Sequence, residues 1–234
     1  MAQIRRVVTT REGGLSSPPY DSFNLGRSVG DAPTAVAANR SRLAGSLGLP
    51  VERLIWMRQV HGATVLAVDG PRPAGSGECD ALVTRERGLA LAVLAADCVP
   101  VLLADARAGV VGAAHAGRPG AAAGVAIAVV QAMVALGADP VDIDVLLGPA
   151  VCGNCYEVPE VMRAEVEASL PGSATTTRRG TPGLDLRAGL VRQLAAAGVS
   201  TVVVDPACTM EDSRYFSYRR DGITGRFAGV VWRP

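Results

Sequence analysis

The chain has 234 residues, a length that suits one α/β domain with a substantial buried core. Lysine and arginine together number 23 and aspartate and glutamate number 22, so the formal net charge of +1 excludes a protein that holds nucleic acid through a strong basic field. The N-terminus lacks the apolar core of a signal peptide, and the longest apolar runs fall far below the roughly 18 to 20 residues that span a bilayer. We expect a single cytoplasmic domain over residues 1–234, without a nucleic-acid or membrane partner.

The N-terminal segment is expected to begin with a strand and to continue into a long loop. Residues 5–10 (RRVVTT) have the composition of a strand, and residues 11–26 are dense in the Gly, Pro, Ser and Asn that form turns. Apolar residues on one face then predict a helix over 35–47, with Asp31 or Thr34 as its N-terminal cap. Loops of this length commonly carry a function, so the first loop is a candidate part of a binding site.

Short apolar runs dominate the middle of the chain and predict buried strands. Residues 54–62 alternate in the manner of a strand in their first half, and residues 64–69 form a second run placed to pair with it. Four closely spaced runs follow and are expected to be the central strands of a buried sheet. They are 80–84, 89–97, 99–105 and 109–115.

The C-terminal half alternates helical and extended patterns. A predicted helix over 120–136 is apolar nearly all round, so we expect other elements to cover it. Asp185 is placed to cap a helix that runs to Ala197, and the tail is expected as two extended pieces around turns at 221–222 and 224–225. The other predicted elements are a strand over 142–147, a helix over 159–170 and a strand over 199–205.

The chain has only two histidines, His61 and His115, and both lie at the ends of predicted strands. Cys98 lies at a third strand end, and a sheet brings such side chains to a common edge. Thiolate and imidazole are the usual ligands of a borderline-soft divalent metal, and three protein ligands leave a fourth position open for chemistry. We therefore interpret His61, Cys98 and His115 as a candidate metal site, although their separations match no zinc-finger spacing.

The same three residues allow two other interpretations. Each histidine could be an ordinary partly buried residue and Cys98 a core thiol. Alternatively, Cys98 could be a nucleophile with His115 as its base, as in cysteine hydrolases. The hydrolase interpretation leaves His61 without a role, so it ranks below the metal site.

The five cysteines are an odd number in a chain too large to depend on disulfides, which favours free thiols in a reducing compartment. Cys152 and Cys155 form a CxxC pair, which in other proteins is half of a zinc site or a redox pair. No second CxxC and no third histidine is present to complete four ligands. We interpret the pair as a turn with incidental thiols, and Cys208 as a residue that could lie near either cysteine group.

Two further regions offer candidates for catalysis or binding. Asp97, beside Cys98, could orient a ligand imidazole or carry a proton, or be an ordinary carboxylate at the sheet edge. Arg11 and Asn24 in the first loop could hold a phosphate or a ribose, or be solvated loop residues. Residue types alone do not decide between these alternatives.

A series of sequence blocks is similar to the signature blocks of one known family, in the same order. The blocks are TTREGGLSSPPYDSFNLGRSVGD, the NR of AANRSRL, QVHG, CDALVT, ADCVPVLLAD, VVGAAHAG, GPAVCGNCYEV, LDLRAGLVRQL and FSYRRDGITGR. Over nearly its full length the chain therefore resembles the bacterial laccase-domain family, also called the multicopper polyphenol oxidase or purine nucleoside phosphorylase family.

The resemblance implies an α+β fold in which mixed β-sheets are flanked by helices in α/β/β/α layers. It also implies a zinc enzyme that acts on purine nucleosides, by phosphorolysis of adenosine, inosine and methylthioadenosine and by deamination of adenosine. Its partners would be a purine nucleoside and phosphate, and we expect a monomer or a small homo-oligomer. A non-catalytic nucleoside-binding or metal-binding module is the alternative from a different class.

Carried over by motif, the metal ligands are the His of QVHG, the Cys of ADC and the His of HAG, which are His61, Cys98 and His115. Asp97 is the candidate proton carrier. The candidate substrate-binding or phosphate-binding residues are Arg11, Asn24, Arg40, Gln59 and Arg118.

The chain departs from the family pattern directly after His115. The family usually has Trp and then Arg after HAG, whereas this chain has Arg118 and then Pro119, which puts the substrate contacts of that corner in question. The family's oxidase label does not suit this chain, because a multicopper cluster needs many imidazoles and the chain has two histidines. A single copper ion in the His/Cys site in vitro could give weak oxidase activity, since Cu(II) outcompetes Zn(II) at such ligands.

Overall fold

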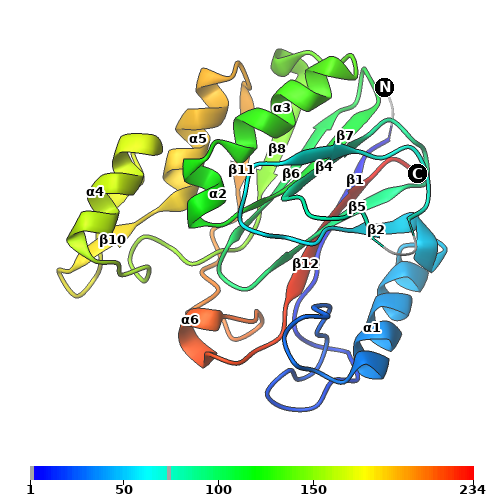
Figure 1. The fold of residues 1–234 in the computed structure, drawn as a ribbon, viewed down its shortest axis with the longest axis horizontal. Coiled ribbons are helices and arrows are strands. Elements are labelled where there is room, and N and C mark those ends of the chain that lie inside the picture. Colours follow the sequence, from blue (N-terminus) through cyan, green and yellow to red (C-terminus); the bar gives the residue numbers. More distant parts are fainter. Residues whose placement is uncertain (1–2, 73–74) are drawn as a thin grey trace.

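The computed structural model describes residues 3–72 and 75–234, and two β-sheets stacked face to face form its centre (Figure 1). The larger sheet has the strand order β11-β8-β6-β7-β4-β3, and the smaller sheet has the order β1-β12-β5-β2. The strands of the larger sheet are β3 (Val65–Ala67), β4 (Ala81–Thr84), β6 (Val99–Asp105), β7 (Val110–Ala116), β8 (Ile143–Leu147) and β11 (Thr201–Val204). Those of the smaller sheet are β1 (Arg5–Val8), β2 (Leu54–Trp56), β5 (Ala90–Ala95) and β12 (Phe227–Trp232), while β9 (Ala174–Thr176) and β10 (Pro182–Leu184) form a separate pair.

Helices cover the outer faces of both sheets (Figure 1). The helices α3 (Val125–Ala135) and α5 (Leu186–Ala196) pack on the larger sheet, and α1 (Pro33–Ser46) packs on the smaller one. The remaining helices are α2 (Arg118–Ala122), α4 (Glu160–Ser169) and α6 (Tyr218–Asp221). The layers are therefore α/β/β/α, as the resemblance implied, and the α+β prediction is confirmed.

The two-residue period of strand β6 explains why both faces of the larger sheet are buried. Val101 and Leu103 point into the core shared with α3 and α5, whereas Leu102 and Ala104 point into the core between the sheets. A strand buried on both faces has no polar alternation, which is why this stretch of sequence is a continuous apolar run. Among the described residues, none of the helices is long and apolar enough to cross a membrane.

Two sequence predictions about neighbouring elements are wrong. Strand β3 pairs in parallel with β4 and not with β2, which pairs with β5 in the other sheet. Apolar period fixes which face of a strand is buried but not which strand lies beside it. The single helix predicted over 120–136 is two helices, because Gly124 between α2 and α3 has a left-handed φ of 83°.

The helix ends differ in how well the sequence predicts them. Asp185 caps α5 by accepting the amide of Ala188 over 3.1 Å, as predicted. At α1 the capping position is held by Ala32 instead of Asp31 or Thr34. The Asp31 carboxylate is turned to the first loop, where Ser16 donates to it over 2.6 Å. The first extended piece predicted in the tail contains helix α6, capped by Ser217.

Candidate metal centre

The structure brings His61, Cys98 and His115 together at one edge of the larger sheet. One ligand atom from each residue lies within 4.8 Å of the other two, and Cys98 Sγ is 3.9 Å from His61 Nε2. The two imidazole rings meet edge to face, with centroids 4.7 Å apart. His61 comes from the loop after β2, Cys98 directly precedes β6, and His115 lies in β7. The grouping predicted from residue types is therefore present in the fold.

A glycine makes this close approach possible. Strands β6 and β7 pair in a register that sets Val99 opposite Ala116, so Cys98 lies beside Gly117. A Cβ atom at Gly117 would come within 2.6 Å of His61 Cδ2 and 3.1 Å of Cys98 Sγ, too close for any side chain. The glycine of the HAG motif is thus needed for packing against two of the three ligands.

The buried carboxylate of Asp80 positions both histidines. It accepts the ring Nδ1–H of His115 over 2.8 Å and the backbone amides of Val60, His61 and Gly62 over 3.2, 2.9 and 2.7 Å. These three bonds hold the loop in which His61 has a left-handed φ of 62°. Sequence reasoning missed Asp80, although it is the second residue of the CDALVT block and precedes β4, the strand paired with β7.

The surroundings of Cys98 and His115 shift the pKa values of both side chains. Burial raises the pKa of the Cys98 thiol, but hydrogen bonds with His115 and His61 outweigh it and lower the pKa to about 6. Burial lowers the pKa of His115, but its bonds with Asp80 and Cys98 raise it to about 9. The metal-free site at neutral pH therefore holds a thiolate beside an imidazolium.

These residues fit a divalent metal of the zinc type. Because His115 gives its Nδ1 to Asp80, its Nε2 is the nitrogen left for a metal, and the carboxylate fixes that choice. One sulfur and two imidazole nitrogens are ordinary zinc ligands, and a set of three leaves a position for water or substrate.

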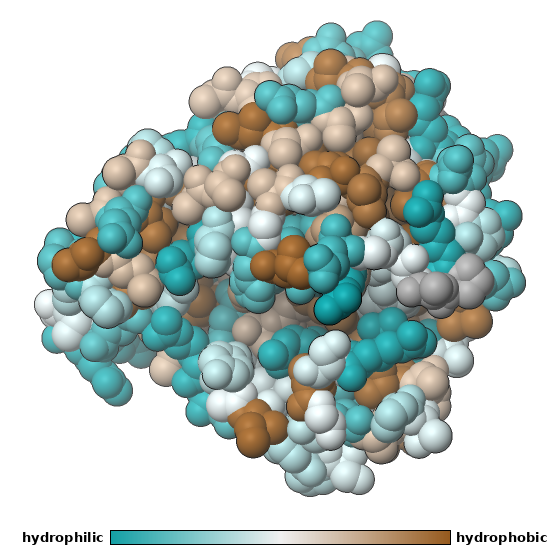
Figure 2. Space-filling view, in the orientation of Figure 1, coloured by the Kyte–Doolittle hydropathy of each residue, from teal (hydrophilic) through white to brown (hydrophobic). Residues whose placement is uncertain are grey.

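A large cavity of about 1020 Å³ opens from the three ligands. Figure 2 shows hydrophilic side chains bordering the hollow in the middle of this face. In the described part of the chain its charged lining, apart from the histidines and Cys98, is five arginines and a single acid, Glu52. The arginines are Arg27, Arg40, Arg58, Arg72 and Arg226. Such an excess of cations in a concave site favours an anionic ligand.

Arg40 is the most constrained of these cations. Its side chain is buried, with Nε donating to the carbonyl of Leu25 over 2.9 Å and the guanidinium lying 3.9 Å above the Trp56 ring. Burial and the nearby charge of Arg27 lower its pKa to about 9. A bound anion would offset the cost of burying the Arg40 charge and its repulsion from Arg27, since it supplies a countercharge that the protein does not.

The structure separates the other predicted binding residues into two groups. Gln59 lines the cavity, but its amide is occupied by the backbone of Leu94, through bonds of 2.9 and 2.8 Å. In the described structure Arg11, Asn24 and Arg118 are not among the cavity-lining residues.

Arg11 and Asn24 make structural contacts within the first loop and its neighbours. The Arg11 guanidinium pairs with Asp21 and lies 4.8 Å from the Phe216 ring centroid. Asn24 is fully buried and its Oδ1 accepts the amides of Gly26 and Arg226, each over 2.9 Å. Both side chains therefore serve to hold the loop in place.

Asp97 lies next to Cys98 but its carboxylate points to the C-terminal segment. It accepts hydrogen bonds from Thr209 Oγ1 over 2.6 Å, from Ser217 Oγ over 2.7 Å and from the amide of Arg219 over 2.7 Å. The carboxylate that orients a ligand imidazole is that of Asp80. Asp97 thus holds the C-terminal segment that contributes Tyr218 to the cavity lining.

The model of the family described as multi-copper polyphenol oxidoreductase laccase matches residues 5–234, and the chain belongs to this family. A Mycobacterium tuberculosis protein named purine nucleoside phosphorylase is 59% identical over 230 residues, covering 98% of this chain and 92% of that protein. A Streptomyces griseus protein of the same name is 58% identical, covering 97% and 93%. Among solved structures, YlmD from Geobacillus stearothermophilus superposes with a TM-score of 0.92 at 37% identity, covering 98% of this chain and 92% of that chain. The resemblance found in the sequence is confirmed.

Proposed function

We propose that this protein is a zinc-dependent purine nucleoside phosphorylase that cleaves adenosine, inosine and methylthioadenosine with phosphate and also deaminates adenosine. The observation that carries the proposal is the opening of a three-ligand metal centre into a cavity lined by arginines. The names of the M. tuberculosis and S. griseus relatives agree with it.

His61, Cys98 and His115 would hold the zinc ion, with Asp80 keeping His115 in the correct tautomer. When bound, the ion supplies Lewis-acid chemistry and lowers the pKa of a bound water to about 7, which suits hydrolytic removal of the purine 6-amino group as ammonia. One metal with one open position agrees better with this chemistry than with a multicopper oxidase, because the chain has two histidines.

Arg40, with Arg27 and Arg226, would bind the phosphate. In phosphorolysis a phosphate oxygen attacks C1′ of the ribose, the C1′–N9 bond breaks, and the purine leaves with the electron pair and takes up a proton. Guanidinium groups hold the attacking dianion in position and offset its charge. We assign this role to Arg40 instead of Arg11, because Arg40 lines the cavity and Arg11 pairs with Asp21.

Tyr218 is our candidate for stacking on the purine. Its side chain is 61% exposed and it lines the cavity, a combination that leaves an aromatic face free for a ligand. Asp97 is assigned a positioning role, since two of its three hydrogen bonds come from Ser217 and Arg219, the residues on either side of Tyr218.

The test is incubation of the zinc-loaded protein with adenosine and phosphate, followed by chromatography for adenine, ribose 1-phosphate and inosine. We expect phosphate-dependent adenine formation and phosphate-independent inosine formation, both abolished in Cys98→Ala. An absence of every product from the metal-loaded protein would refute the proposal and favour a non-catalytic nucleoside-binding or metal-binding module.

A cysteine hydrolase is the second candidate, and the lowered pKa of Cys98 beside a protonated His115 favours it. His61→Ala separates the two functions, because a hydrolase would keep its Cys98–His115 pair whereas the zinc enzyme would lose metal and activity together. We expect the second result, since His61 shares the site with both other residues.

A further inference from the structure

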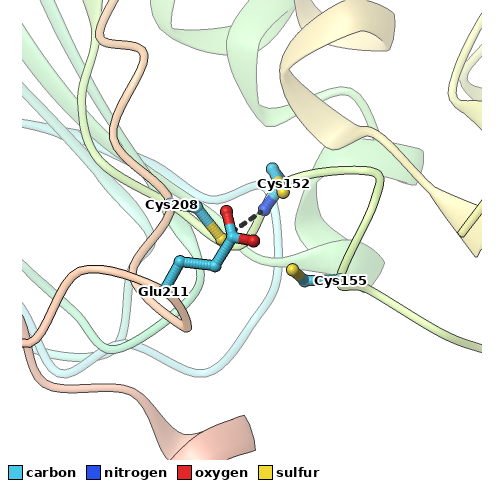
Figure 3. Close-up of side chains that lie close together, drawn as sticks. All are labelled: Cys152, Cys155, Cys208 and Glu211. Atoms are coloured by element: carbon cyan, nitrogen blue, oxygen red, sulfur yellow. Dashed lines mark hydrogen bonds between the residues drawn. The ribbon is translucent and has the colours of Figure 1, made fainter. Parts of the chain in front are cut away.

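A second group of metal-ligating side chains lies away from the cavity, at the C-terminal side of β8 and β11. Cys152, Cys155, Cys208 and Glu211 each offer one ligand atom, and these atoms lie within 4.8 Å of one another (Figure 3). In the described part of the chain none of the four lines the arginine-rich cavity, so the group is separate from the catalytic centre. The nucleoside chemistry proposed above uses none of these side chains.

Two turns of the same kind present these ligands. The carbonyl of Cys152 accepts the amides three and four residues later, both over 2.9 Å, and Cys155 is the first of those two residues. The carbonyl of Cys208 accepts the amides three and four residues later over 3.1 and 2.8 Å, and Glu211 is the first of those. The chain thus places a CxxC turn beside a CxxE turn, and paired ligands separated by two residues are typical of structural zinc sites.

The sheet brings the two turns together although they are far apart in sequence. Strands β8 and β11 are parallel neighbours, and each turn follows the carboxyl end of one of them. A bridge between Ala150 and Cys208 continues their pairing, and the amide of Thr209 donates to the carbonyl of Ala150 over 3.1 Å. The amide of Cys152 donates to Cys208 Sγ over 3.4 Å, so a polar hydrogen already points at this sulfur, as donors do around metal-bound thiolates.

The separations suit a tetrahedral ion. Zinc–sulfur bonds of about 2.3 Å put tetrahedral ligand atoms about 3.8 Å apart, so the upper limit of 4.8 Å requires shifts of about 1 Å. Arg178 pairs with one carboxylate oxygen of Glu211, which leaves the other oxygen for a metal. Cys208 is buried, Cys152 and Cys155 are half-buried, and Glu211 is exposed, so the group is protected but reachable from solvent.

We propose that Cys152, Cys155, Cys208 and Glu211 bind one Zn²⁺ ion as a closed, four-ligand structural site. The sequence offers no second CxxC and no third histidine to complete this pair, whereas the fold brings Cys208 and Glu211 to it. Three thiolates favour zinc over magnesium or calcium, which prefer oxygen ligands.

The site would fasten two loops behind the catalytic centre. The amide of Val151 donates to the carbonyl of Asp97 over 3.1 Å, and Thr209 Oγ1 donates to the Asp97 carboxylate over 2.6 Å. Val151 directly precedes the proposed ligand Cys152, and Thr209 directly follows the proposed ligand Cys208. A metal joining the two turns would therefore hold both loops against the residue that precedes Cys98.

The first measurement is the zinc content of the protein purified without added metal. We expect about two zinc ions per chain in the wild type, about one in Cys98→Ala, about one in Cys155→Ala and none in the double variant. Asn154→Ala is the matched control, because Asn154 lies in the same turn without offering a ligand, and it should keep both ions. Zinc in the wild type that never exceeds one per chain, with all of it lost in Cys98→Ala, would overturn the proposal.

Cobalt substitution gives a readout that does not depend on catalysis or on zinc counting. In the Cys98→Ala background the first site is disabled, so any strong sulfur-to-cobalt charge-transfer absorption must come from the second. We expect such absorption in that variant, its loss when Cys155→Ala is added, and its weakening when Glu211→Gln is added. A disulfide between Cys152 and Cys155 in freshly purified, unreduced protein, detected by peptide mass, would overturn the proposal and indicate a redox pair.

Discussion

The two clusters of metal-ligating side chains differ in what surrounds them. His61, Cys98 and His115 are three candidate ligands that line a cavity of about 1020 Å³. Cys152, Cys155, Cys208 and Glu211 are four candidate ligands carried by two turns outside the cavity. A set of three ligands leaves a position for substrate, whereas a set of four closes the coordination sphere. This difference is the basis for proposing catalysis at the first cluster and the holding of two loops at the second.

The clusters also differ in how they hold charge. At the first, the imidazoles and Asp80 offset one another, and the pKa of Cys98 falls to about 6. At the second, burial and the neighbouring thiols raise the pKa values of Cys152 and Cys155. Neighbouring thiolates repel one another, and the nearby cation Arg178 already pairs with Glu211, so a bound metal would favour the thiolate forms at the second cluster.

Cys98→Ala is expected to have the largest effect, because it disables the first cluster and leaves the second intact. Cys98→Ala removes the sulfur ligand of the first centre, so phosphorolysis and deamination should fall to background. The same variant should keep its second zinc ion, and adding a chelator should lower its melting temperature by several degrees because bound metal stabilises the folded state. Product assays and differential scanning calorimetry check both results. A chelator-insensitive melting temperature would contradict the role given to the second site.

Asp80→Asn tests the support of the first centre. The amide cannot replace a carboxylate that accepts four hydrogen bonds, so we expect zinc affinity at this centre to fall about 10- to 100-fold. Competition with a zinc-binding dye measures the change. Glu78→Gln, two residues away and paired with Arg58 on the surface, is the control and should leave the affinity unchanged. Equal losses in both variants would remove Asp80 from its proposed role.

Arg40→Ala, compared with a second arginine variant on helix α1, tests whether Arg40 binds phosphate. Loss of a charge-assisted contact worth about 1.5 to 3 kcal/mol should raise the KM for phosphate by at least about 10-fold and leave the zinc content intact. Arg42→Ala is the matched control, because Arg42 lies two residues along α1 and donates to the carbonyl of Gly13. Kinetics at varied phosphate concentration distinguish them, and an unchanged KM in Arg40→Ala would assign the anion to another arginine.

The smallest expected effect is the pH dependence of Cys98 alkylation. In the metal-free protein the rate of Cys98 alkylation by iodoacetamide should rise with pH through a midpoint of about 6, because the thiolate is the reactive form. Cys152 and Cys155, with raised pKa values, should react only at higher pH. The gain in rate at neutral pH is several-fold at most, since a less basic thiolate is a weaker nucleophile. Peptide mass spectrometry across a pH series measures each midpoint, and a Cys98 midpoint near 9 would contradict the thiolate–imidazolium pair.

The first cluster was predictable because its ligand types are rare in this chain. Two histidines and a cysteine at strand ends leave few ways to build a metal site, and the predicted grouping matches the structure. The second cluster was not predictable in this way, because Glu211 is one of 22 acidic residues and lies 56 residues after Cys155. Arg40 and Arg11 were equal candidates in the sequence, and only the packing of α1 against Trp56 placed Arg40 in the cavity.

The sequence by itself determined most of the elements, the buried character of the central strands and the candidate ligands of the first cluster. These features depend on local periodicity and on residue chemistry, which a linear chain displays directly. The tertiary structure alone decided that β3 pairs with β4, that Asp80 holds both histidines, and that a CxxC turn meets a CxxE turn. Each of these depends on strand order and register, which join residues distant in the chain and which local pattern does not specify.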